Sequence, residues 1–202
     1  MTHVAQRIGV FGGAFDPPHR GHVALAQAAV AQLELCQLLV VPTGQAAHKQ
    51  RPLSPAVHRL AMCELAFAGV PQVAVDPRET LRSGPSYTVD TLEELQRQYP
   101  QARLYLLIGQ DQAQALHHWH RASVLPLLAT IYVAARPESA DPSSPIATSQ
   151  VESFALQWLH MPSMPHSATG IRYRLAHQQG IETLVTEAVA SYIATHHLYQ
   201  SA

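Results

Sequence analysis

Short apolar runs alternate with longer helix-like segments along most of this chain. Runs rich in Val, Ile and Leu predict strands at 8–11, 37–41, 72–75, 103–108 and 130–135. Segments of helical composition predict helices at 23–33, 56–68, 88–99, 169–179 and 182–197. The run at 103–108 is almost continuously apolar, which is typical of a strand buried on both faces. Strands separated by helices favour a parallel sheet with right-handed crossovers, so we expect a single-domain, Rossmann-like, doubly wound α/β fold that ends in two helices.

The composition indicates which broad class of protein this is, but it does not indicate which reaction or ligand the protein has. The 202 residues are 47% hydrophobic and 13% charged, which suits one globular domain with a sizeable core. A formal net charge of −1 provides no long-range field for a polyanion, so a protein that coats nucleic acid is disfavoured. No apolar run approaches the ~18 residues of a membrane span, and the N-terminus lacks a secretory pattern. Cys36 and Cys63 lie in apolar segments, so we expect both in the core, no disulfide framework and a cytoplasmic protein.

The segment after the first predicted strand carries the strongest chemical signal. It reads Phe11-Gly-Gly-Ala-Phe-Asp-Pro-Pro-His19-Arg-Gly21-His22 and joins a strand to a helix through a loop that contains glycine and proline. The start of a helix binds phosphate through free N–H groups, and the spacing of His19 and His22 lets one turn aim both imidazoles at the same anion. We expect Gly21 to leave room for a phosphate between them. The alternative is a plain connection that carries two solvated histidines.

Further groups suited to anions follow other predicted strands. His48 and Lys49 lie in the loop after the second strand, at the same carboxyl edge of the sheet, although an isolated lysine there would also suit solvent. Ser167 and Thr169 are natural caps for the first C-terminal helix. Arg172 in that first turn opposes the helix dipole unless an anion is bound, so we expect its guanidinium to meet phosphate rather than a protein partner. Simple capping is the alternative for this segment.

The region after the central strand suggests a site for a nucleoside. Gly109 permits a tight exit from the strand, and Asp111 is placed to accept hydrogen bonds from ribose hydroxyls. Trp119 lies among histidines, a polar neighbourhood that favours stacking on a flat heteroaromatic ring over a place in the core. These histidines do not complete a metal set at the usual spacing, so we expect them to be solvated. The segment 86–88 before a helix is either a turn with a cap or a set of N–H groups that bind a substrate carboxylate.

In this order, the motifs from residue 8 to about 174 resemble the bacterial nicotinate-nucleotide adenylyltransferases of the nucleotidylyltransferase superfamily. His166 and the histidines around Trp119 depart from the pattern of that family. The resemblance implies a single nucleotidylyltransferase domain over residues 1–202 that transfers AMP from ATP to nicotinate mononucleotide. The products would be deamido-NAD and pyrophosphate, formed in NAD biosynthesis by direct in-line attack on the α-phosphate without a covalent intermediate.

The resemblance also implies roles for individual residues. Catalytic roles fall to His19, His22, Lys49 and Arg172. ATP would be bound by Gly12, Gly13, Phe15, His19, His22, Gly109, Asp111, Arg136, Ser167, Thr169 and Arg172. Nicotinate mononucleotide would be bound by Tyr87, Thr88 and Trp119. Mg²⁺ would be held by the ATP phosphates rather than by protein side chains.

The expected partners are therefore two small molecules, with no nucleic acid or membrane, and a homo-oligomer remains open. Three alternatives remain beside this interpretation. A pantetheine-phosphate adenylyltransferase shares the first motif, a nicotinamide mononucleotide adenylyltransferase differs only in the pyridine substituent that it reads, and a nucleotide-binding regulator would have lost catalysis.

Overall fold

Six parallel strands form the central sheet of the structure, a computed structural model that describes residues 6–46, 52–135, 153–161, 164 and 166–200. The strands are β1 (Arg7–Gly13), β2 (Gln37–Pro42), β4 (Val73–Val75), β6 (Arg103–Gly109), β7 (Ala129–Ala135) and β8 (Gln157–His160). Their spatial order is β4-β2-β1-β6-β7-β8, which confirms the predicted doubly wound α/β fold. The order reverses between β1 and β6, so the loops that follow these two strands open a crevice at the carboxyl edge of the sheet.

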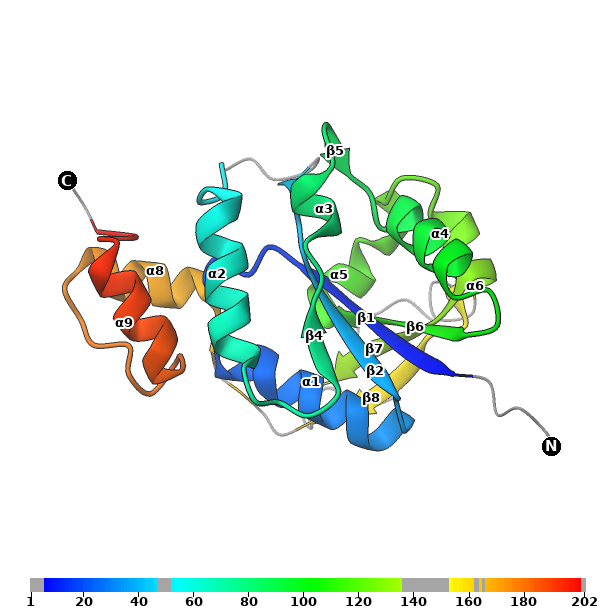
Figure 1. Ribbon diagram of the computed structural model, residues 1–202, viewed down its shortest axis with the longest axis horizontal. Coiled ribbons are helices and arrows are strands. Elements are labelled where there is room, and N and C mark those ends of the chain that lie inside the picture. Colours follow the sequence, from blue (N-terminus) through cyan, green and yellow to red (C-terminus); the bar gives the residue numbers. More distant parts are fainter. Residues whose placement is uncertain (1–5, 47–51, 136–152, 162–163, 165, 201–202) are drawn as a thin grey trace.

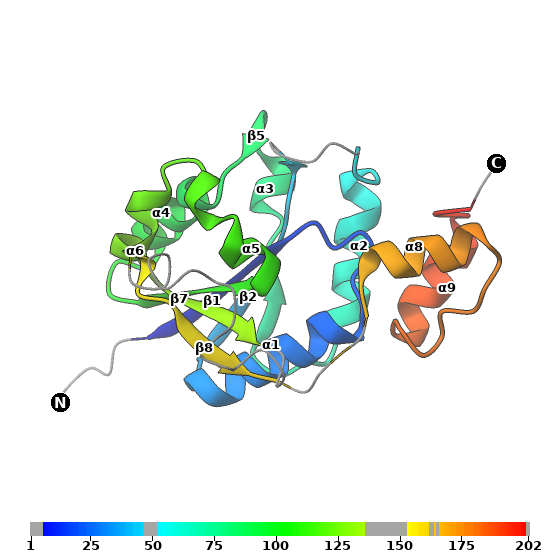
Figure 2. The ribbon, with the colours of Figure 1, turned by 180° about the vertical axis from the view of Figure 1, so that it is seen from behind.

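Helices cover both faces of this sheet (Figure 1). The face that presents Phe11, Val40 and Leu107 packs against α1 (Arg20–Leu33) and α2 (Ala56–Phe67), and α9 (Glu187–Thr195) packs against α2 in the same hydrophobic core. The opposite face presents Val10 and Leu106 to α4 (Thr88–Gln98) and α6 (Leu125–Leu128). Neighbouring residues of one strand therefore enter different cores, as the alternation of side chains along a strand requires. Figure 2 shows α8 (Ala168–Ala176) and α9 together at one end of the molecule, beside α2.

The structure contains short elements that the sequence pattern did not predict. β8 is one of these, and β3 (Gln45–Ala46) pairs with β5 (Pro85–Ser86) in a small separate sheet. The remaining short elements are α3 (Arg78–Leu81), α5 (Gln110–Gln114), α6 (Leu125–Leu128) and the 3₁₀ turns Leu116–His118 and Ala122–Val124. α9 begins at Glu187 and not at residue 182, because the Thr186 side chain accepts a hydrogen bond from the backbone N–H of Val189 and caps the helix there.

The two cysteines differ in their surroundings. Cys63 is buried on α2, as predicted, whereas Cys36 is exposed and the prediction that it belongs to the core is wrong. Cys36 lies in the short connection between α1 and β2, where the Sγ atom faces the carbonyl oxygen of Arg7 at 3.2 Å. Within the described ranges, none of the helices has the length and apolar character needed to cross a membrane.

Candidate active site

The loop between β1 and α1 is held in place by the aromatic ring of Phe15. This residue is 2% exposed and has a φ of 47°, in the left-handed region that few residues other than glycine adopt. Its ring packs edge-on against Phe11, with centroids 5.3 Å apart, and against Phe67 of α2. The packing stabilises this backbone conformation and turns the chain toward the start of α1, where His19 is the N-cap residue.

His19 and His22 come together at the start of α1 as a stacked pair. Their ring centroids lie 3.7 Å apart with an interplanar angle of 24°. The backbone N–H of His19 donates to Nδ1 of His22 at 3.1 Å, so a neutral His22 carries its proton on Nε2 and can donate it to a ligand. A Cβ atom at Gly21 would lie 3.0 Å from Nδ1 of His19. Gly21 therefore makes room for the His19 imidazole. The prediction that a phosphate lies between the two rings is wrong, because the rings stack directly on each other.

Burial keeps both imidazoles neutral near pH 7. It lowers the pKa of His19 to about 4, with a further contribution from the nearby His166, and the side chain is 8% exposed. Burial also lowers the pKa of His22 well below its ordinary value, and the neighbouring His19 adds to this effect. Among the described residues, Nδ1 of His19 is a buried polar atom without a hydrogen-bond partner. A polyanion beside the pair would favour the protonated forms, because it would place negative charge next to the two imidazoles.

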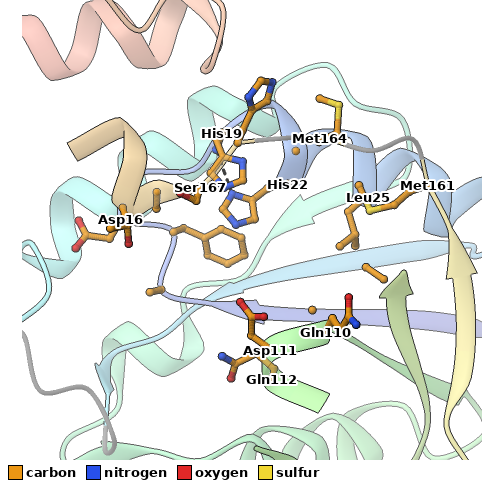
Figure 3. Close-up of a pocket in the computed structure, with 18 of the residues that line it drawn as sticks. Asp16, His19, His22, Leu25, Gln110, Asp111, Gln112, Met161, Met164 and Ser167 are labelled. Carbon is orange, nitrogen blue, oxygen red and sulfur yellow. Dashed lines mark hydrogen bonds between the residues drawn. The ribbon is translucent and has the colours of Figure 1, made fainter. Parts of the chain in front are cut away.

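A cavity of about 970 Å³ opens beside the two histidines. It lies between the β1–α1 loop, α5 and the first turn of α8, and it is drawn in Figure 3. Ser167 accepts a hydrogen bond from the backbone N–H of Gly170 at 3.1 Å, which confirms its predicted role as the cap of α8. Asp111 lies in the first turn of α5, across the cavity from His19 and His22 (Figure 3). The other predicted residues in this lining are Phe15, Gly109, Thr169 and Arg172.

The Arg172 side chain lines this cavity, and its guanidinium already makes hydrogen bonds to other residues of the protein. Its Nη1 donates to the carbonyl oxygen of Asp16 at 2.7 Å, and its Nη2 donates to Oγ1 of Thr169 at 3.2 Å. The prediction that the guanidinium has no protein partner is therefore wrong. The contact with Asp16 joins the N-terminal half of α8 to the β1–α1 loop, so one side chain links the two sides of the cavity.

A second cavity of about 660 Å³ lies on the other side of the same loop. Its lining includes Ser86, Thr88 and Trp119. Gly12 and Gly13, which the sequence predicts to bind ATP, line this cavity and not the larger one. His118 and His120 also line this cavity. Both side chains are exposed to solvent, as predicted. The ring of Tyr87 lies against the ring of His120 in a tilted arrangement, with centroids 4.3 Å apart and an interplanar angle of 30°. Tyr87 itself does not form part of the lining.

The two cavities meet at the β1–α1 loop and the exit of β6. Both are lined by Ala14, Phe15, His22, Leu25, Gly109 and Gln112. His22 therefore lies where a ligand in one cavity would face a ligand in the other. An arrangement of this kind suits the joining of two bound molecules, because each can be held by its own cavity while the reacting groups meet at the boundary.

Two buried residues with ionisable side chains, Arg59 and Glu79, support the site and were not predicted from the sequence. Arg59 is 1% exposed and donates to three backbone carbonyls, those of Ser54 at 2.8 Å, Ala14 at 2.9 Å and Gly44 at 3.1 Å. The helical spacing of the sequence could have indicated this burial, because Arg59 lies on the same apolar face of α2 as Met62, Cys63 and Ala66. Glu79 lines the smaller cavity and accepts a hydrogen bond from the Thr91 hydroxyl at 2.7 Å, and burial raises its pKa.

Two predicted site residues, Lys49 and Arg136, lie outside the described residues, as does His48. Within the described part of the chain, no group of three or more His, Cys, Asp or Glu side chains is arranged to hold a metal ion. The structure thus brings most of the predicted residues to two adjoining cavities at the switch point of the sheet.

Comparison with known proteins identifies the family. The cytidylyltransferase-like family model matches residues 10–174. A protein of Albidiferax ferrireducens named "Probable nicotinate-nucleotide adenylyltransferase" is 53% identical over 98% of this chain and 100% of its own length. A protein of Methylibium petroleiphilum with the same name is 42% identical over 96% of this chain and 92% of its own length.

Solved structures agree on the fold. The Plasmodium falciparum nicotinic acid mononucleotide adenylyltransferase in complex with NaAD superposes with a TM-score of 0.78 at 19% identity, over 96% of this chain and 97% of that one. Its complex with APC has the same TM-score at 18% identity and the same coverage of both chains. This chain belongs to the cytidylyltransferase-like family and, within it, to the nicotinate-nucleotide adenylyltransferases.

Proposed function

We infer that this chain transfers AMP from ATP to nicotinate mononucleotide and forms deamido-NAD and pyrophosphate in NAD biosynthesis. The observation that carries this conclusion is the pair of cavities that meet at His22. One offers histidines, an arginine and the start of a helix, which suit a polyphosphate. The other offers a tryptophan ring and the start of α4, which suit a flat ring that carries a carboxylate.

ATP would occupy the larger cavity. His19 and His22 would face its α- and β-phosphates, and the first turn of α8 with Thr169 and Arg172 would hold the outer phosphates. Asp111 would accept hydrogen bonds from the ribose, from the opposite wall. Lys49 and Arg136 keep the roles that the family resemblance gives them, on the outer phosphates and on the ATP side respectively.

Nicotinate mononucleotide would occupy the smaller cavity. Trp119 would stack on its pyridine ring, and main-chain N–H groups around Tyr87 and Thr88, at the start of α4, would bind the carboxylate. The mononucleotide phosphate would then face His22 from this side. Gly12 and Gly13, which line the same cavity, would allow the substrate to approach the end of β1 closely.

The reaction needs alignment and charge stabilisation more than proton transfer. A phosphate monoester has a second pKa of about 6, so the attacking group is mostly dianionic near pH 7 and needs no general base. One oxygen of the mononucleotide phosphate forms a bond to the ATP α-phosphorus, and the bond from that phosphorus to the pyrophosphate oxygen breaks. Nε2 of His22 would donate to the phosphoryl oxygens where negative charge gathers, and Arg172 would hold the pyrophosphate that leaves.

Mg²⁺ bound through the ATP phosphates would neutralise part of their charge. Mg²⁺ is commonly bound by substrate phosphates and water with few protein ligands, so we propose that the ATP phosphates hold it rather than protein side chains. We also propose that the protein works in the cytoplasm as a single domain on these two small molecules.

The test is a parallel assay of pyrophosphate release from ATP with three acceptors. We expect turnover with nicotinate mononucleotide, much weaker turnover with nicotinamide mononucleotide, which lacks the carboxylate, and none with phosphopantetheine. Preferred turnover of either of the other acceptors would reject the assigned substrate. Absence of turnover with all three, in a protein that still binds ATP, would support the regulator that has lost catalysis.

A further inference from the structure

We propose that Tyr199, near the end of the chain, is a positioning residue for ATP that acts through Asp16 on Arg172. The inference rests on the proposed function, because it takes the larger cavity as the ATP site. Tyr199 lies beyond residues 10–174, which the family model matches, whereas both residues on which it acts line the larger cavity.

Asp16 joins three distant parts of the chain at the edge of this cavity. The residue is 2% exposed. Its Oδ1 accepts a hydrogen bond from the Tyr199 hydroxyl at 2.6 Å, and its Oδ2 accepts one from the backbone N–H of Ser54 at 3.3 Å. Its carbonyl oxygen accepts the 2.7 Å hydrogen bond from Arg172. The position of Asp16 therefore sets the position of Arg172 on α8.

The end of the chain is shaped to bring the Tyr199 hydroxyl to this point. α9 packs against α2, and the backbone after it turns sharply at His197, with φ of 50°, and at Tyr199, with φ of 63°. Left-handed conformations are unfavourable for residues other than glycine, so they persist only where surrounding contacts maintain them. Here Leu198 donates its backbone N–H to the carbonyl of Ile193 at 3.0 Å, and the side chains of Leu198 and Tyr199 pack on the hydrophobic core.

The charge of Asp16 explains why one hydroxyl matters for ATP. A buried carboxylate at the wall of a polyphosphate cavity is unfavourable unless donors satisfy it. Burial and the contact with Asp16 raise the pKa of Tyr199, so the phenol keeps its proton and remains a donor. Without that donor, the carboxylate would compete more strongly for the guanidinium of Arg172. Arg172 would then be drawn away from the ATP phosphates.

The test compares two Tyr→Phe variants that each remove one hydroxyl from the C-terminal region. Tyr199→Phe removes the donor to Asp16 and leaves the ring. Tyr192→Phe is the matched control, because its hydroxyl contacts Nδ1 of His58 at 3.0 Å on the α2–α9 side and does not contact Asp16. The dissociation constant of ATP, measured by calorimetric titration without a second substrate, should rise about three- to tenfold in Tyr199→Phe and stay unchanged in Tyr192→Phe. KM for nicotinate mononucleotide should be unchanged in both.

A double-mutant cycle separates positioning from simple loss of structure. In an Arg172→Ala background, Tyr199→Phe should no longer weaken ATP binding, because the residue through which it acts is gone. An equal effect of Tyr199→Phe in both backgrounds would overturn the proposal, as would loss of folding in Tyr199→Phe but not in Tyr192→Phe. Because the readout is ATP affinity, the absence of turnover in the wild-type protein would reject the proposed function and leave this result interpretable.

Discussion

The buried pair of histidines should make the protein lose stability as the pH falls below neutrality. The pKa of His19 is 6.5 in the unfolded chain and about 4 in the fold, so between these values the unfolded state binds more protons. His19 therefore has little effect on the free energy of unfolding above pH 6.5, and it destabilises the fold progressively as the pH falls toward 4. Each tenfold change in proton affinity is worth about 1.4 kcal/mol, so this one group should remove about 2 kcal/mol at pH 5 and about 3 kcal/mol below pH 4.

His19→Gln isolates this contribution, because glutamine does not titrate. The free energy of unfolding should be measured by urea denaturation at pH steps from 7.5 to 4.5, without ATP and in a buffer free of phosphate. We expect the wild-type curve to fall toward the acid side more steeply than that of His19→Gln, with the difference between them growing by about 2 kcal/mol between pH 7 and pH 5. ATP should reduce the difference, because a polyanion favours the protonated imidazole. A difference that stays constant from pH 7 to pH 4.5 would refute the view of a buried, neutral His19.

Two further predictions concern one substrate each. Arg172→Ala should raise KM for ATP and lower the free energy of unfolding by about 1–2 kcal/mol, because it removes the hydrogen bond to the Asp16 carbonyl; a loss of stability with unchanged ATP kinetics would show that Arg172 is purely structural. Trp119→Ala should weaken binding of nicotinate mononucleotide by about 1–3 kcal/mol and remove most of the fluorescence change that this ligand causes, with ATP affinity nearly unchanged. Trp158, in β8, is the control fluorophore, and a Trp119→Ala protein that lost ATP binding instead would reverse the assignment of the two cavities.

Local sequence patterns predicted the parts of the site that depend on neighbours in the chain. The spacing of His19 and His22 fixes both at the start of one helix, and Ser167 caps α8 through the N–H of Gly170, three residues on. The order of strands and helices also determined the sheet, since parallel connections have a preferred hand. β8 was not predicted because its sequence, Gln-Trp-Leu-His, lacks the run of Val, Ile and Leu that marked the other strands, and α5 was not predicted because its five residues are too few to show a helical period.

Contacts between distant segments could not be read from the sequence in the same way. Nothing local relates Tyr199 to Asp16, or indicates that Arg172 donates to the Asp16 carbonyl. Cys36 follows a helix and precedes a strand, yet the connection between them leaves it exposed. Arg59 illustrates why such contacts cannot be predicted from the sequence. A charged side chain is expected to be exposed to solvent, and only the folded chain brings three backbone carbonyls within reach of its guanidinium. Long-range hydrogen bonds decide these cases, and they depend on the tertiary structure.

In the proposed reaction, His22 stabilises the transferred phosphoryl group at the point where the two cavities meet. The most direct measurement is single-turnover formation of deamido-NAD by His22→Ala, with both substrates saturating, beside the wild-type protein. Loss of one donor that acts where charge develops costs about 10²–10³ in rate, so the rate should fall by that factor while the dissociation constant of ATP changes far less. A His22→Ala protein with a near-normal rate would contradict this account of the site.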